Sequence, residues 1–234
     1  MEKILGVVGG LGPEAGLEFC LNVARRAAAQ DGAVPHIILD SVSIPTESMV
    51  EFAHGGEPEG GKEILLESVR RLNNAGASTI AIPCNTVHVF IDDLRAASSA
   101  PIISIIEETA SACKRLGVKK ICLLATSKTI NGGLYHRQFT GAGIEAVCPP
   151  ADAQRKLEGI IIKINCLDGE PSDYGEIAGI AISLAKERQA DLVVLGCTDL
   201  SPSAGKITQS GIKVVDSLEE LEAAASAHLV ENKH

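Results

Sequence analysis

The sequence predicts an α/β fold with two pseudo-symmetric lobes, each a mostly parallel four-stranded sheet flanked by helices. Three observations lead to this prediction. Short apolar runs alternate with amphipathic stretches, both halves of the chain open with a strand and a turn rich in Gly or Thr, and each half has a strand that ends in a cysteine. Apolar runs between helices are typical of parallel strands that are covered on both faces.

The apolar runs and the stretches between them locate the predicted elements in order. Each run has the length of a buried strand, and the intervening stretches repeat apolar residues with helical spacing. We expect strands at residues 4–8, 36–40, 79–83, 102–105, 121–125, 144–147, 192–195 and 212–215. We expect helices at residues 13–29, 62–74, 90–98, 107–116, 153–165 and 174–189, and a last helix whose Ser217 N-cap forms a capping box with Glu220.

A weak internal repeat divides the chain. GVVGGLGPEAG starts at Gly6 and LLATSKTINGG at Leu123, whereas IAIPCNT contains Cys84 and VVLGCTD contains Cys197, at nearly the same spacing in each half. We therefore expect a first lobe of residues 1–104 plus 216–234 with Cys84, and a second lobe of residues 105–215 with Cys197. The active site is expected in the interlobe cleft, because open α/β sheets bind ligands at the carboxyl ends of their strands.

The composition excludes several classes of protein. Lys and Arg number 21 against 30 acidic residues, and the net charge of −9 has the wrong sign for a nucleic-acid partner. No apolar run is long enough to span a membrane, and the N-terminus enters the first strand without a signal-peptide pattern. Seven cysteines without a CxxC pair, and histidines without ligand spacing, predict reduced thiols, no metal and a cytoplasmic location.

Two of the seven cysteines stand apart from the others. Cys84 and Cys197 each end a predicted buried strand where the chain turns toward a helix, and each is followed by Thr within two residues. A helix N-terminus offers unpaired N–H groups, which lower a thiol pKa and bind a carboxylate. The rest have positions typical of small buried hydrophobes: Cys20, Cys113, Cys122, Cys148 and Cys166.

Two facing thiols suit the inversion of a stereocentre. A thiolate removes the α-proton from one face of the carbon, and a thiol on the other face returns a proton. The enolate that develops needs N–H groups and hydroxyls directed at the carboxylate. Asn85, Thr86 and Thr198 follow the two cysteines and are expected to supply them.

The motifs GGLGPEAG at residues 9–16, PCNTVH at 83–88 and GCTDL at 196–200 resemble those of the aspartate/glutamate racemase family. The resemblance covers nearly the whole chain. It implies an amino-acid racemase that needs no pyridoxal phosphate or other cofactor, acts on a small amino-acid substrate and forms a homodimer. By position it implies Cys84 and Cys197 as the catalytic pair, and substrate contacts from Gly10, Leu11, Gly12, Asn85, Thr86, Thr198 and either Thr126 or Thr129.

One segment departs from the family pattern and concerns the substrate. Aspartate-specific members carry an Ile-Pro-Asp-Arg-Thr type of segment whose Arg binds a carboxylate, but here Glu47 stands at the Arg position of residues 44–48. Lys163 is near the position of a second cation of those members but not at it. Aspartate or glutamate is the family default, whereas Glu47 would repel a dicarboxylate and favour a neutral or basic amino acid (lysine, ornithine or arginine). Pro-Thr at 45–46 and IEET at 106–109 also resemble the broad-specificity branch. The alternative is that Glu47 is a solvated loop residue.

Other functions fit parts of the sequence. Gly10, Gly12 and Gly16 after the first strand, with Asp40 at the end of the second, are similar to the turn of a nucleotide-binding oxidoreductase, one residue off the usual spacing. The same cysteines also suit a related cysteine isomerase or decarboxylase on this fold, or a binding protein that has kept the site. Residues 54–61 are rich in Gly and form either a lid over the site or an exposed loop.

Overall fold

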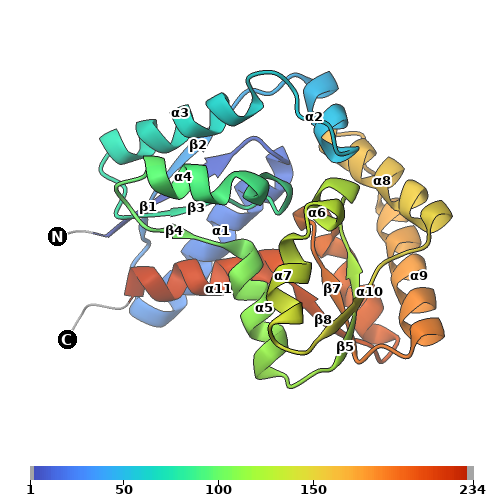
Figure 1. Cartoon of the computed structure of the whole chain (residues 1–234). Helices are drawn as coiled ribbons and strands as arrows, with labels where there is room; N and C mark the ends of the chain where they lie inside the picture. Colours follow the sequence, from blue (N-terminus) through green and yellow to red (C-terminus); the bar gives the residue numbers. More distant parts are fainter. Residues whose placement is uncertain (1–2, 231–234) are drawn as a thin grey trace.

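The computed structural model describes residues 3–230 and contains two four-stranded sheets, which confirms the predicted fold (Figure 1). The strand order is β2-β1-β3-β4 in the first sheet and β6-β5-β7-β8 in the second, and every neighbouring pair is parallel. The matching orders are the structural counterpart of the sequence repeat. The strands are β1 (Ile4–Gly9), β2 (His36–Ser41), β3 (Thr79–Ala81), β4 (Ile102–Ile103), β5 (Lys120–Leu124), β6 (Glu145–Val147), β7 (Leu192–Leu195) and β8 (Lys213–Asp216).

Helices alternate with the strands along the chain and pack on both faces of each sheet. In the first half they are α1 (Pro13–Asp31), α2 (Thr46–Ala53), α3 (Gly61–Asn74), the 3-10 helix η1 (Thr86–Phe90) and α4 (Ile91–Ala97). In the second half they are α5 (Ile105–Arg115), α6 (Ser127–Asn131), α7 (Leu134–Thr140), α8 (Ala151–Asn165), α9 (Pro171–Arg188), the 3-10 helix η2 (Thr198–Ser203), α10 (Ala204–Gln209) and α11 (Ser217–Val230).

The central strands are mostly apolar because both faces of each sheet are covered. In β7, Leu192 and Val194 join the core cluster that includes side chains of α5, α7 and α11, whereas Val193 and Leu195 join the cluster of α8 and α9. All four side chains are fully buried. Each such burial contributes about 1.5–3 kcal/mol, so alternate residues of one strand hold helices on opposite faces.

The last helix connects the two halves of the molecule. α11 follows β8 of the second sheet but packs against α1 of the first half and against α5 (Figure 1). Asn22 Nδ2 donates to Glu222 Oε1 at 2.9 Å, and Arg26 forms ion pairs with Glu219 at 3.2 Å and Glu222 at 3.3 Å. α11 therefore packs against helices of both predicted lobes, and the grouping of residues 216–234 with the first lobe stays a prediction.

Several short elements differ from the sequence prediction. α2, α6, α7 and α10 lie in segments without a predicted element, since each has only five to eight residues, too few for a clear apolar period. α6 begins where the Thr126 hydroxyl accepts a hydrogen bond from the Thr129 amide, at 3.2 Å.

Among residues 3–230, no helix is both long and apolar enough to cross a membrane.

The start of α11 also differs from the predicted capping box. The carboxylate of Asp216 accepts the amide hydrogen of Leu218 at 3.0 Å and thus takes the capping position. Ser217 is the first residue of the helix, and its hydroxyl accepts a hydrogen bond from Asn85 instead. The residue predicted to cap the helix therefore contacts the predicted active site.

Candidate active site

The two cysteines lie just beyond the ends of equivalent strands. β3 ends at Ala81 and β7 at Leu195. The prediction that Cys84 and Cys197 are the last residues of their strands is therefore wrong, because both belong to the turns that follow. Each turn leads into a short 3-10 helix, η1 or η2. Because β3 and β7 occupy the same place in their sheets, the two thiols enter the site from equivalent positions.

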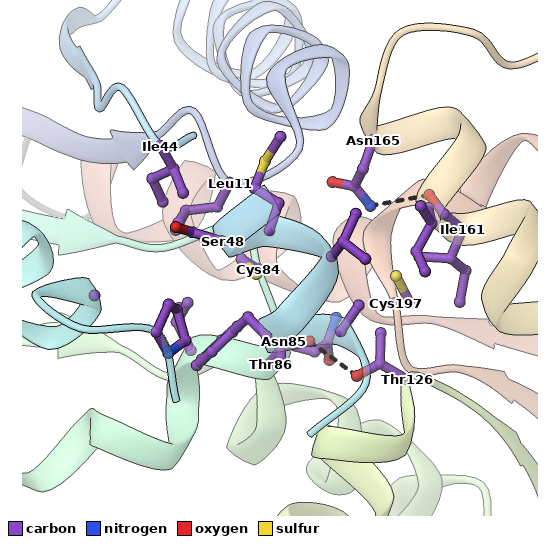
Figure 2. A pocket seen from close by; sticks show the side chains of 18 of the residues that line it. Leu11, Ile44, Ser48, Cys84, Asn85, Thr86, Thr126, Ile161, Asn165 and Cys197 are labelled. Carbon is purple, nitrogen blue, oxygen red and sulfur yellow. Dashed lines mark hydrogen bonds between the residues drawn. The ribbon is translucent and has the colours of Figure 1, made fainter. Parts of the chain in front are cut away.

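Both thiols line one cavity of about 220 Å³ between elements of the two halves (Figure 2). This volume is about that of seven water molecules in the liquid, enough for a small molecule. The cavity brings together most of the predicted site residues: Leu11, Cys84, Asn85, Thr86, Thr126, Cys197 and Thr198. Sequence reasoning missed Asn165 and Asp199, which also line it, although Asp199 lies in the GCTDL motif.

Burial determines the proton state of both thiols. It raises the pKa of Cys84 to about 11, even though Cys84 borders the cavity and is not fully covered. Amide hydrogen bonds from Val87 and Thr86 lower the pKa of Cys84, but by less than burial raises it. Burial, followed by the charge of Asp199, raises the pKa of Cys197 well above its usual value. Both thiols are therefore protonated at neutral pH, which reverses the lowering that the sequence predicted.

Asp199 places a carboxyl group against one of the two thiols. Its Oδ2 accepts a hydrogen bond from Asn165 Nδ2 at 2.9 Å and lies 3.5 Å from Cys197 Sγ, which donates to it. Burial raises the pKa of Asp199 to about 6, against the lowering by these two hydrogen bonds. A side chain at Gly12 would put its Cβ 2.9 Å from Asp199 Oδ1, so the glycine leaves room for this carboxyl group.

Three buried hydroxyls form a cluster across the two halves of the chain. Thr86 Oγ1, from η1, lies 3.0 Å from Thr126 Oγ1 and 3.3 Å from Thr129 Oγ1, while Thr126 donates to Thr129 at 3.1 Å. Thr86 and Thr126 line the cavity and Thr129 supports them from behind. The cluster can direct hydroxyl donors at a carboxylate, since a hydroxyl hydrogen rotates to suit its acceptor.

Asn85 is held from two sides by residues distant in sequence. Its Oδ1 accepts a hydrogen bond from the Tyr135 hydroxyl at 2.5 Å, and its Nδ2 donates to Ser217 Oγ at 3.0 Å. Tyr135 belongs to α7 and is fully buried, so the amide has a defined orientation at the cavity wall. The hydrogen bonds from Tyr135 and to Ser217 therefore also fix the direction of the second N–H bond of the Asn85 amide.

Main-chain carbonyls next to Cys84 anchor the turn that carries this thiol. Thr198 Oγ1 donates to the carbonyl of Pro83 at 3.3 Å and so joins the two cysteine turns. His88 Nδ1 donates to the carbonyl of Cys84 at 2.8 Å, while its Nε2 accepts the amide hydrogen of Ile105 at 3.3 Å. Burial lowers the pKa of His88 to about 4, so the ring is a neutral structural group.

Other residues that the sequence analysis considered lie outside the cavity wall. Gly10 has φ +83, and a Cβ there would lie 2.1 Å from the carbonyl oxygen of Val42, so this residue serves close backbone packing. Glu47 is exposed on α2 and does not line the cavity, although its neighbour Ser48 does. Lys163 forms ion pairs with Asp173 at 3.0 Å and Glu170 at 3.5 Å, away from the lining residues.

Residues 54–61 contribute to the wall and contact the second half of the chain. Pro58, Glu59 and Gly61 line the cavity. Lys128, in α6, donates to the Gly55 carbonyl at 3.2 Å and to Glu57 at 3.0 Å. The segment therefore covers part of the site.

Asp40 is the predicted ribose ligand of the oxidoreductase interpretation. Its carboxylate instead accepts two hydrogen bonds from Arg71, at 2.8 and 3.1 Å.

Comparison with known proteins identifies the family. Residues 8–225 match the family model described as Asp/Glu/hydantoin racemase. The chain is 27% identical to the broad specificity amino-acid racemase RacX of Bacillus subtilis over 221 residues, which are 92% of each chain. Its structure is similar to the aspartate racemase of Picrophilus torridus (TM-score 0.81, 25% identity, covering 97% and 94% of the two chains) and to an aspartate racemase homologue from Pyrococcus horikoshii (0.75, 27%, covering 99% and 100%). The protein therefore belongs to the Asp/Glu/hydantoin racemase family and is an isomerase.

Proposed function

We propose that this protein is a cofactor-independent amino-acid racemase in which Cys84 and Cys197 act as opposed bases. The observation that carries the proposal is that two thiols from equivalent turns line one small cavity. A racemase needs an acid–base group on each face of the α-carbon, and two cysteines that differ only in protonation can exchange roles between the two directions.

The reaction starts from one thiolate and one thiol, because one cysteine gives its proton to solvent when the substrate binds. The proton transfers that follow balance without a further reactant. The thiolate of one cysteine takes the α-proton: a C–H bond breaks, an S–H bond forms, and the electron pair moves into the carboxylate as an enediolate. The thiol of the other cysteine then gives its proton to the opposite face of the carbon and becomes a thiolate. The product is the other enantiomer, and the two cysteines have exchanged protonation states.

The polar lining of the cavity supports the binding of an amino acid at its backbone end. The hydroxyls of Thr86 and Thr126 and the amide of Asn85 supply donors for the α-carboxylate, where charge builds up in the enediolate. Donors fixed in advance cost no reorganisation during the reaction. The ammonium group of the substrate supplies a positive charge near the sulfurs, which favours the thiolate that burial disfavours.

The assembly and compartment of the enzyme are part of the proposal. All seven cysteines carry free thiols, which fits a reducing cytoplasm. The family resemblance implies a homodimer, and sedimentation equilibrium at micromolar concentration tests this. The fitted mass is expected to be twice that of the 24.4 kDa chain. A mass equal to that of the single chain would contradict the dimer.

Exchange of the α-proton in D2O, followed by NMR over a panel of L- and D-amino acids, tests the mechanism. Cys84→Ser and Cys197→Ser should each lose at least about 100-fold in racemisation, since general acid–base groups contribute that much. Each variant keeps one thiol and is expected to exchange the proton of one enantiomer faster than the other. Cys20→Ser, on the half-buried face of α1, is the matched control and should retain activity. Full racemisation by either active-site variant would refute the assignment.

A further inference from the structure

We infer that this racemase site accepts an amino acid with an uncharged, apolar side chain, such as that of leucine or methionine. The inference rests on the proposed function and names the substrate class that the function leaves open. It follows from how polar, apolar and charged side chains are distributed around the cavity.

Most polar groups of the cavity lie near the two cysteines, whereas Ser48 lies beside Leu11 and Ile44. In Figure 2, Asn85, Thr86 and Thr126 lie on one side of Cys84, and Ile44 and Leu11 lie on the other side. The backbone groups of a substrate need the polar side, because hydroxyl and amide donors are found there. The substrate side chain then extends toward the apolar wall.

The apolar wall comes from several separate elements. It includes the segment before α2, α2 itself, η1 and the cavity-facing side of α8. The rings of Phe52 and Phe90 stack with their centres 6.0 Å apart and form one part of it. The wall includes Ile44, Met49, Phe52, Phe90, Ile161 and Ile162.

A carboxylate side chain would find no cation at this wall. No Lys, Arg or His is among the described residues that line the cavity. The ammonium of Lys128 lies 5.6 Å from the centre of the Phe52 ring, but it is bound by Glu57 at 3.0 Å and by the Gly55 carbonyl at 3.2 Å, and Lys128 does not line the cavity. An ionised group that is buried without a partner is strongly disfavoured.

Neither of the two acidic residues that line the cavity is well placed to bind the cationic end of a basic substrate side chain. Glu59 is exposed, and Asp199 is engaged by Asn165 and lies against Cys197, where the α-carbon must be. Glu47, the residue that suggested a basic substrate, does not line the cavity. The wall therefore offers no cation to a carboxylate side chain, and it offers a basic side chain only the exposed, solvent-screened Glu59.

The first experiment compares substrates of the unmodified enzyme. Rates of α-proton exchange in D2O are measured for leucine, methionine and phenylalanine against aspartate, glutamate, lysine and arginine. We expect kcat/KM for leucine or methionine to exceed that for each charged amino acid by at least about 100-fold. Equal or faster exchange of a charged amino acid would overturn the inference and leave the racemase proposal intact. Absence of exchange for every amino acid would overturn the racemase proposal itself.

The second experiment changes the wall. Met49→Lys places a cation in the cavity, and the matched control Val34→Lys places one at a position that is 78% exposed. We expect Met49→Lys to lower kcat/KM for leucine at least about tenfold and to raise that for aspartate, with the control unchanged. If Met49→Lys, shown by circular dichroism to be folded, left the preference between leucine and aspartate unchanged, the inference would be wrong. If it did not fold, the comparison of substrates on the unmodified enzyme would still decide.

Discussion

The hydroxyl of Thr198 donates a hydrogen bond to the carbonyl oxygen of Pro83, with 3.3 Å between the two oxygens. Thr198 follows Cys197, and Pro83 precedes Cys84, so this bond ties together the two turns that carry the thiols. Two bases that act on opposite faces of one carbon need a fixed separation. The contact is therefore positioned to hold the geometry on which the proposed reaction depends.

Thr198→Val removes this hydrogen bond and keeps the shape of the side chain. We expect the free energy of unfolding to fall by about 1 kcal/mol, because the Pro83 carbonyl loses its partner, and kcat to fall about tenfold, because the turns are less well fixed. Urea unfolding and α-proton exchange measure the two effects. Thr208→Val is the control, since its hydroxyl bonds within α10 at an exposed position. A loss of stability with unchanged kcat would argue against a role in positioning.

Gly10→Ala should destabilise the fold more than Gly211→Ala. Both glycines have a φ near +85, at +83 and +86, where a side chain costs about 1–2 kcal/mol. Only at Gly10 would the added Cβ meet another atom, the Val42 carbonyl oxygen at 2.1 Å, whereas nothing lies within 4 Å at Gly211. The free energies of unfolding of the two variants, measured by chemical denaturation, distinguish the cost of backbone strain from the cost of the steric clash at residue 10. Equal losses of stability would mean that the loop of Val42 moves away freely.

Asp199→Asn should lower the pKa of the Cys197 thiol. The carboxylate raises the pKa of Cys197 through its charge and through the hydrogen bond that it accepts from the thiol. Its charge also raises the pKa of Cys84. Alkylation by iodoacetamide, located by peptide mass mapping across a pH series, should therefore be faster in the variant above about pH 6, where Asp199 is ionised, and below the thiol pKa. Asp168→Asn changes an exposed carboxylate and serves as the control. Unchanged alkylation would show that burial alone governs this thiol.

Tyr135→Phe tests whether Asn85 needs its hydrogen bond for orientation. The variant removes the 2.5 Å contact to Asn85 Oδ1 without touching the cavity wall. We expect KM to rise roughly tenfold while the pH profile of kcat stays the same, since no titrating thiol is altered. Tyr174→Phe, at the other tyrosine of the chain, is the matched control. A change in the pH profile would contradict a purely positional role.

Asp216 should make the protein less stable as pH rises. Burial raises the pKa of its carboxyl to about 7, far above the value near 3.8 of the unfolded chain. Between these values the folded state holds a proton that the unfolded state releases, so stability is fully present at low pH and declines by up to about 1.4 kcal/mol per pH unit. Asp216→Asn should show a shallower decline between pH 5 and 7 in urea unfolding. A slope equal to that of the parent protein would mean that Asp216 is ionised in the fold.

The sequence by itself determined the two sheets and the equivalent positions of Cys84 and Cys197 in the two halves of the chain. Apolar runs and helical spacing are local patterns, and the repeat of IAIPCNT and VVLGCTD assigns Cys84 and Cys197 to equivalent points of the two halves. The short helices escaped prediction because they have too few residues for a period. The ends of β3 and β4 were predicted too late, since pairing with neighbouring strands and not apolar character decides where a strand stops.

Only the tertiary structure decided which side chains face the cavity and how they titrate. Glu47 lies outside the wall, while Asn165 and Asp199 line it, because α8 and the turn after β7 converge there from distant parts of the chain. The raised pKa of Cys84 has the same origin. Burial is the sum of contacts from segments far apart in sequence, so it can outweigh the local amide groups that a motif reveals.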